Sequence, residues 1–122
     1  MTATRLVLAL CALYGGAGVA LMAAGTHAAG QNATTAGQML LFHASAAMAA
    51  TLARKAGHLA PGLGRLAVAL LLAGVALFAA DLSSLAFRDA RLFPMAAPTG
   101  GVTMIAGWAL LAVSALVGGK TR

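Results

Sequence analysis

The stretch Leu66–Phe87, LAVALLLAGVALFAADLSSLAF, decides how this chain must fold. This stretch of 22 residues carries one charge, at Asp81. As a helix rising 1.5 Å per residue, it extends about 33 Å. That length crosses a hydrocarbon core of about 30 Å. Because a carboxylate is costly in lipid, we expect Asp81 to face protein or a polar cavity.

The composition of the whole chain supports a membrane setting. Of the 122 residues, 61% are hydrophobic and 8% are charged, whereas soluble domains are about half apolar and a quarter charged. The net charge of +6 comes from basic residues in short connections and near the ends, without the aromatic-rich basic patch of a nucleic-acid interface. We therefore expect contact with membrane lipid and no nucleic-acid binding.

Three further apolar segments accompany the central one. The sequence predicts an all-α integral membrane bundle, a single membrane domain over residues 1–122, with spans at about 6–24, 36–53, 66–87 and 99–118. Polar connections are expected at 26–35, 54–65 and 88–98. The first segment also resembles a signal peptide, but its removal would leave three spans and no soluble domain, so we expect it to be retained.

The basic residues predict the orientation of the four spans. Two of them, Arg88 and Arg91, fall on one side of the membrane. Six fall on the other side: Arg5, Arg54, Lys55, Arg65, Lys120 and Arg122. Because short cytoplasmic loops are enriched in Lys and Arg, this bias favours cytoplasmic N- and C-termini, with the bacterial inner (plasma) membrane as the expected location.

Polar side chains from different spans are expected to gather in the outer half of the membrane. Counted from the outer span ends, Asp81 lies about 9 Å deep, His43 about 11 Å and Trp108 about 14 Å. Gln38 is shallower and His27 lies near the outer surface. We expect Asp81 to pair with His43 or His27 and the Trp108 indole to donate a hydrogen bond. Such a network either fixes helix register or binds a ligand or proton.

A metal or haem site is a separate alternative. His27, Met39 and His43 carry imidazole and thioether groups that suit Cu(I) or haem iron. However, the sequence contains no HxxxH motif, no CxxCH motif and no cysteine pair. Methionine at helical spacing is more often packing, so we expect no metal and no cofactor.

Small residues and four short motifs carry a family resemblance. Glycine-rich faces are expected to let helices approach closely, on the first span around Gly18 and Gly25 and on the fourth around Gly100 and Gly107. The motifs are Gly25-Thr26-His27, Phe42-His43-Ala44, Gly74 to Phe78, and Pro98-Thr99-Gly100-Gly101 followed by Gly107-Trp108. In order and spacing they resemble the GAH, YHA, GxxxF and PxGG…GW elements of domain of unknown function family 423.

The resemblance implies four transmembrane helices and no established activity. The chain departs from the family pattern at Ala28, where glycine is usual, and at Ala79-Ala80-Asp81, where a serine-and-glycine run is usual. Asp81 is therefore a local feature of this chain.

These observations lead to one functional expectation and two alternatives. The serines lack the setting of a nucleophile elbow and the chain has two carboxylates, so we expect no enzyme. The expected function is an accessory or interaction component of a membrane assembly, in contact with other subunits or with its own copies. The alternatives are an oligomeric transporter of an ion, proton or small solute using His43 and Asp81, and metal or haem binding through His27 and His43.

The topology is testable with reporters fused to the two ends of the chain. Both reporters should be accessible from the cytoplasmic face, because four spans return the chain to the side on which it began. Reporters reached from opposite faces would require an odd number of spans and would contradict this topology.

Overall fold

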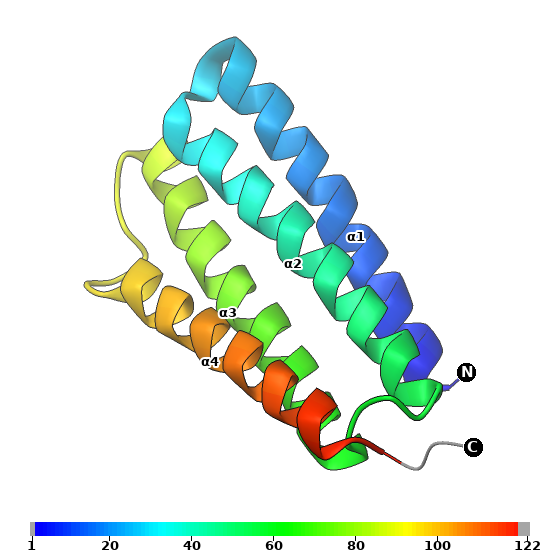
Figure 1. Ribbon diagram of the computed structural model, residues 1–122. Helices are drawn as coiled ribbons and strands as arrows, with labels where there is room; N and C mark the ends of the chain where they lie inside the picture. Colours follow the sequence, from blue (N-terminus) through cyan, green and yellow to red (C-terminus); the bar gives the residue numbers. More distant parts are fainter. Residues whose placement is uncertain (1, 120–122) are drawn as a thin grey trace.

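The chain folds into four long helices. The computed structural model describes residues 2–119 (Figure 1). Its elements are α1 (Ala3–Ala24), the π-helical turn η1 (Gly25–Ala29), α2 (Gln31–Lys55), α3 (Pro61–Arg88) and α4 (Ala96–Val117). All four α-helices are long and apolar enough to cross a membrane. The predicted all-α fold is confirmed, and the four apolar helices suggest a multi-pass membrane protein.

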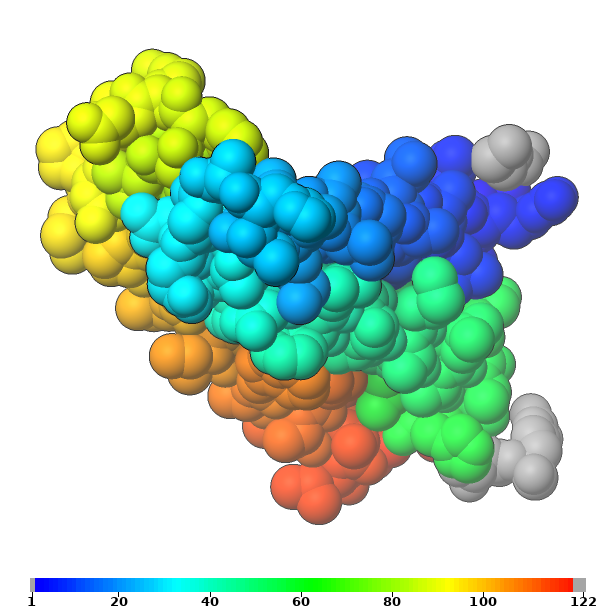
Figure 2. Space-filling model, turned by 90° about the horizontal axis from the view of Figure 1, so that it is seen from above, coloured from blue at the N-terminus to red at the C-terminus, as the bar shows by residue number. Residues whose placement is uncertain are grey.

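Helices that follow one another in sequence are neighbours in space. The main contacts join α1 to α2, α2 to α3, and α3 to α4. Figure 2 shows α1 (blue) and α4 (orange to red) at opposite edges, with α2 between them. The arrangement is a helix bundle whose two edge helices keep broad outward faces. Of the residues in the apolar stretch of each helix, 11% are buried in α1 and 22% in α4, against 44% in α2 and in α3.

The connection between α1 and α2 is much shorter than the sequence indicated. The predicted polar loop 26–35 is wrong, because η1 continues α1 and α2 begins at Gln31. Gly30 turns the chain with a φ of 82°, which favours glycine, and its N–H donates to the Gly25 carbonyl. The Thr34 N–H donates in turn to the Gly30 carbonyl, so the polar residues after Gly30 lie within a helix.

The other helix boundaries also differ from the prediction, by up to five residues. Helix α3 begins at Pro61, five residues before the predicted span, because proline is favourable in the first turn, where its missing N–H has no helical partner. Helix α4 begins at Ala96 and ends at Val117. Lys120 and Arg122, two of the basic residues from which the orientation was predicted, lie outside the described residues.

Both ends of the described chain lie at the end of the molecule that also holds the α2–α3 connection (Figure 1). That end therefore carries Arg5, Arg54, Lys55 and Arg65, and the opposite end carries Arg88 and Arg91. Ala60 and Ser114 join the α2–α3 connection to α4, with the Ala60 N–H donating to the Ser114 carbonyl (3.1 Å) and the Ser114 hydroxyl to the Ala60 carbonyl (3.2 Å).

Glycines set the distance between packed helices, as the sequence predicted. A Cβ at Gly18 of α1 would lie 2.8 Å from the Gly37 carbonyl oxygen of α2. A Cβ at Gly100 of α4 would lie 2.7 Å from both the Gly74 carbonyl oxygen and the Phe78 backbone nitrogen of α3. These separations leave no room for a side chain, so the helix backbones themselves are in contact.

The close approach of α3 and α4 predicts unequal effects of two adjacent substitutions. Gly100→Val should lower the free energy of unfolding by about 1–3 kcal/mol, the usual cost of overpacking, because the new methyl groups would overlap α3. Gly101→Val is the matched control, since nothing lies within 4 Å of a Cβ at Gly101. Thermal unfolding of the detergent-purified protein measures both variants, and equal melting temperatures would contradict the packing.

Candidate functional site

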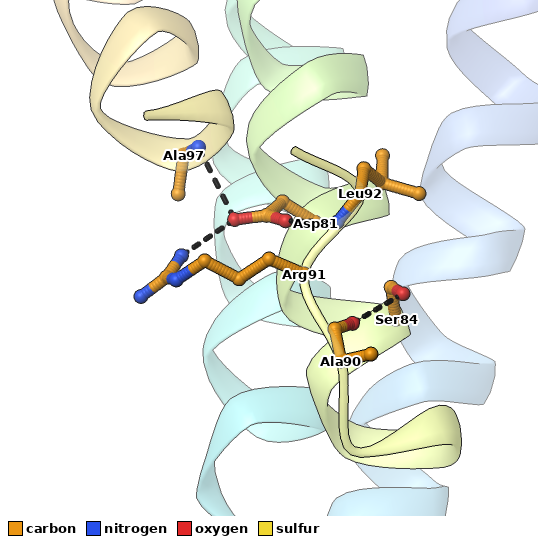
Figure 3. A network of polar contacts seen from close by, with 6 residues as sticks. All are labelled: Asp81, Ser84, Ala90, Arg91, Leu92 and Ala97. Atoms are coloured by element: carbon orange, nitrogen blue, oxygen red, sulfur yellow. Dashed lines mark hydrogen bonds and ion pairs between the residues drawn. The ribbon is translucent and has the colours of Figure 1, made fainter. Parts of the chain in front are cut away.

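Asp81 lies on α3 and is the centre of a network of polar contacts. Its side chain is fully buried. The carboxylate accepts hydrogen bonds from Arg91 Nη1 (2.6 Å), from the Leu92 N–H (2.8 Å) and from the Ala97 N–H (3.2 Å), as Figure 3 shows for Arg91 and Ala97. Arg91 is half exposed. Both carboxylate oxygens are thus occupied by donors, one of them charged.

The Asp81 carboxylate also caps α4 from a neighbouring helix. Helix α4 begins at Ala96, and Met95 at its N-cap position offers no side-chain hydrogen bond. The first N–H groups of a helix lack partners within the helix and favour negative charge. By accepting from Ala97, Asp81 supplies the cap that the α4 sequence lacks.

The α3–α4 connection runs back along α3 to reach this carboxylate (Figure 3). Asp89 adopts a left-handed conformation with φ of 55°, and so does Met95 with φ of 70°. The Ser84 hydroxyl of α3 donates to the Ala90 carbonyl at 2.5 Å. Asp81 and Ser84, three residues apart on one face of α3, together hold the returning segment.

The predicted pairing of Asp81 with a histidine is wrong, because its charged partner is Arg91. The sequence indicates Arg91 only as a loop charge that predicts orientation. A signal was present, since a buried carboxylate needs an opposite charge and Arg91 lies ten residues later, beyond the end of the same helix. What the sequence did not reveal is that the connection turns back along α3.

His43 and Trp108 form a second, separate polar contact. The Trp108 indole Nε1–H donates to His43 Nε2 at 3.0 Å, so the predicted indole donor is confirmed, with His43 as its acceptor. His43 Nδ1 lies 2.8 Å from the Met39 carbonyl oxygen. Because Nε2 must accept, this geometry assigns the ring proton of neutral His43 to Nδ1, which donates to Met39. The two rings meet edge-on, with centroids 5.7 Å apart.

The remaining predicted residues do not join these contacts. His27 is exposed in η1, and Gln38 is exposed on α2. Met39 is partly buried against the core cluster between α2, α3 and α4. Within residues 2–119, His, Cys, Asp and Glu side chains form no group of three able to hold a metal ion. The residues predicted to form one site therefore make two separate contacts, Asp81 with Arg91 and His43 with Trp108. His27 and Gln38 lie on the surface.

The fold and these contacts define an all-helical protein with four apolar helices of membrane-spanning length. The chain belongs to the family described as "Protein of unknown function (DUF423)", whose model matches residues 20–101. No curated protein and no solved structure matches the chain. The matched segment extends from the end of α1 into the first turns of α4.

Most of the motifs that carried the resemblance meet one another in the fold. Gly100 of the PxGG-like element packs on Gly74 and Phe78 of the GxxxF-like element. His43 of the YHA-like element accepts from Trp108 of the GW element. At the α1–α2 turn, a Cβ at Gly25 would overlap the Thr34 side chain. The motif residues therefore act in helix packing.

The network predicts that Asp81 stabilises the fold. Asp81→Asn should lower the free energy of unfolding by about 2–4 kcal/mol, because an uncharged amide loses a charge-assisted hydrogen bond and part of a helix cap. The matched control is Asp89→Asn, at an exposed left-handed position that asparagine tolerates. Thermal unfolding measures stability, and hydrogen exchange at Leu92 and Ala97 should accelerate in Asp81→Asn alone. Unchanged exchange at both amides would contradict the cap.

Proposed function

We propose that this protein is a non-catalytic accessory or interaction component of a membrane assembly. In this proposal the four helices span a bacterial inner membrane as one domain, with both ends in the cytoplasm. Basic residues at the end where α1 begins support this orientation, by the same charge bias that the sequence displays.

The hydrogen bonding of the buried polar groups supports a structural role for them. Asp81 has three donors, and both nitrogens of His43 are engaged. Among residues 2–119, every buried side-chain nitrogen and oxygen has a hydrogen-bond partner. The transporter alternative depends on one site shared by His43 and Asp81, whereas these residues have separate partners. The metal alternative depends on His27 and His43, of which one is exposed and the other engaged.

The outward face of α1 carries the proposal. With about 100° between successive residues, a strip of small residues runs along the side of α1 that faces away from buried Cys11 and Gly18, between Ala9 and Ala23. All of them are exposed: Ala9, Ala12, Gly16, Ala20 and Ala23.

Such a face is suited to another helix. In lipid, small residues at spacings of three and four let two backbones approach and gain van der Waals contact. The predicted glycine face of α1 around Gly18 already packs against α2. The Gly16 face is a second face on the same helix, and larger exposed side chains, Leu13 and Val19, border it. We infer that a helix of a different membrane protein packs there.

A photo-crosslinking residue at Ala12, introduced in native membranes, tests this function. We expect an adduct with a foreign membrane protein, and Gly16→Leu should reduce its yield by about fivefold or more, since a bulky side chain forced into a close packing contact costs about 1–3 kcal/mol. Ala17→Leu is the matched control, because Ala17 is exposed but lies about 100° away around the helix.

Three outcomes would contradict the proposal. They are an adduct only between copies of this chain, no protein adduct at all, and equal losses in Gly16→Leu and Ala17→Leu. Both variants should retain the melting temperature of the parent protein, because no neighbouring atom lies within 4 Å of a Cβ at Gly16.

A further inference from the structure

A crevice opens between three helices at the basic end of the molecule. Its volume is about 230 Å³, and its walls come from the start of α1, the end of α2 and the start of α3. Val7, Val68 and Leu72 form its apolar interior, and Arg54 and Arg65 line it nearer the helix ends. From Arg65 to Leu72 the crevice follows α3 for about 10 Å.

Within residues 2–119, no acidic side chain pairs with either arginine. The chain contains two acidic residues, Asp81 and Asp89, and both lie toward the opposite end of α3. Asp81 is already paired with Arg91. The Arg54 side chain lies against Gly64 of α3, where a Cβ would be 3.3 Å from its Cδ atom, so Arg54 extends across from α2 toward the helix that carries Arg65.

The first turn of α1 adds to the positive potential of the crevice. Ala3 and Thr4 line it, and they belong to the N-terminal turn of α1. Helix N-termini carry partial positive charge. Two uncompensated guanidinium groups and a helix N-terminus thus stand at one end of an apolar slot, and this charge favours an anion attached to an apolar chain.

We propose that this crevice binds an anionic phospholipid of the surrounding leaflet. One acyl chain lies along Val68 and Leu72, and the headgroup phosphate lies between Arg54 and Arg65. Arginine suits this role because its planar guanidinium donates two parallel hydrogen bonds to a phosphate. The proposal rests on the helices lying among lipids in a membrane, and it is independent of any protein partner at α1.

Native mass spectrometry of the full chain in detergent tests the site, with phosphatidylglycerol and phosphatidylcholine of identical acyl chains as probes. The protein should retain one phosphatidylglycerol and little phosphatidylcholine. The double variant Arg54→Gln/Arg65→Gln should retain phosphatidylglycerol about tenfold less, since each basic residue near an anionic surface contributes appreciably to binding. Inorganic phosphate at the same concentration should not displace the lipid, because it lacks the chain that fills the crevice.

Two further variants separate this site from general attraction to a basic surface. Arg5→Gln/Lys55→Gln removes the same charge from the same end without touching a residue that lines the crevice, and it should bind like the parent. Ala69→Trp keeps every charge but fills the crevice, and it should lose the lipid. Binding that survives Arg54→Gln/Arg65→Gln or Ala69→Trp, that falls equally in the control, or that phosphate alone abolishes would overturn the proposal.

Discussion

The fold depends on how one carboxylate is accommodated in apolar surroundings. A buried, unpaired charge would cost several kcal/mol, and Asp81 avoids this by drawing Arg91 and two backbone N–H groups to itself. Those donors come from the returning connection and from the first turn of α4. The carboxylate therefore determines the path of the connection and the point at which α4 begins.

The residues that carry the family resemblance have a different task. They meet where helix backbones touch, as at Gly74 and Gly100, or where α2 and α4 are joined, as at His43 and Trp108. Asp81, at which the sequence departs from that resemblance, adds a charged clamp to a scaffold already held by close packing. The two kinds of contact are complementary, because glycine contacts fix the distance between α3 and α4, and the clamp fixes the start of α4.

Much of the fold follows from the sequence, because hydrophobic length and glycine spacing are local properties of the chain. The four helices and the buried faces around Gly18 and Gly100 were predictable for this reason. The start of α2 was not, because a single glycine, Gly30, makes the turn for which the sequence predicted a ten-residue connection at 26–35. The partner of Asp81 was also missed, since it depends on the direction of a connection that no periodicity reports. In the candidate site, the depth of Trp108 along its span was enough to predict that its indole donates a hydrogen bond. Depth alone wrongly grouped His27 and Gln38 with it, because depth does not say which way a side chain faces.

The returning connection leaves two adjacent helices of unequal length. Helix α3 has 28 residues and α4 has 22, so they extend about 42 Å and 33 Å. In a bilayer about 30 Å thick at its core, the apolar stretch of each helix matches the hydrocarbon, because that of α3, Leu66–Phe87, also extends about 33 Å. Leu92, Phe93 and Met95 on the connection are exposed beside the shorter helix. The first turn of α4 meets α3 at Asp81, whereas α3 continues to Arg88. In a bilayer these three side chains would therefore supply apolar surface beside the last turns of α3, beyond the point where α4 begins.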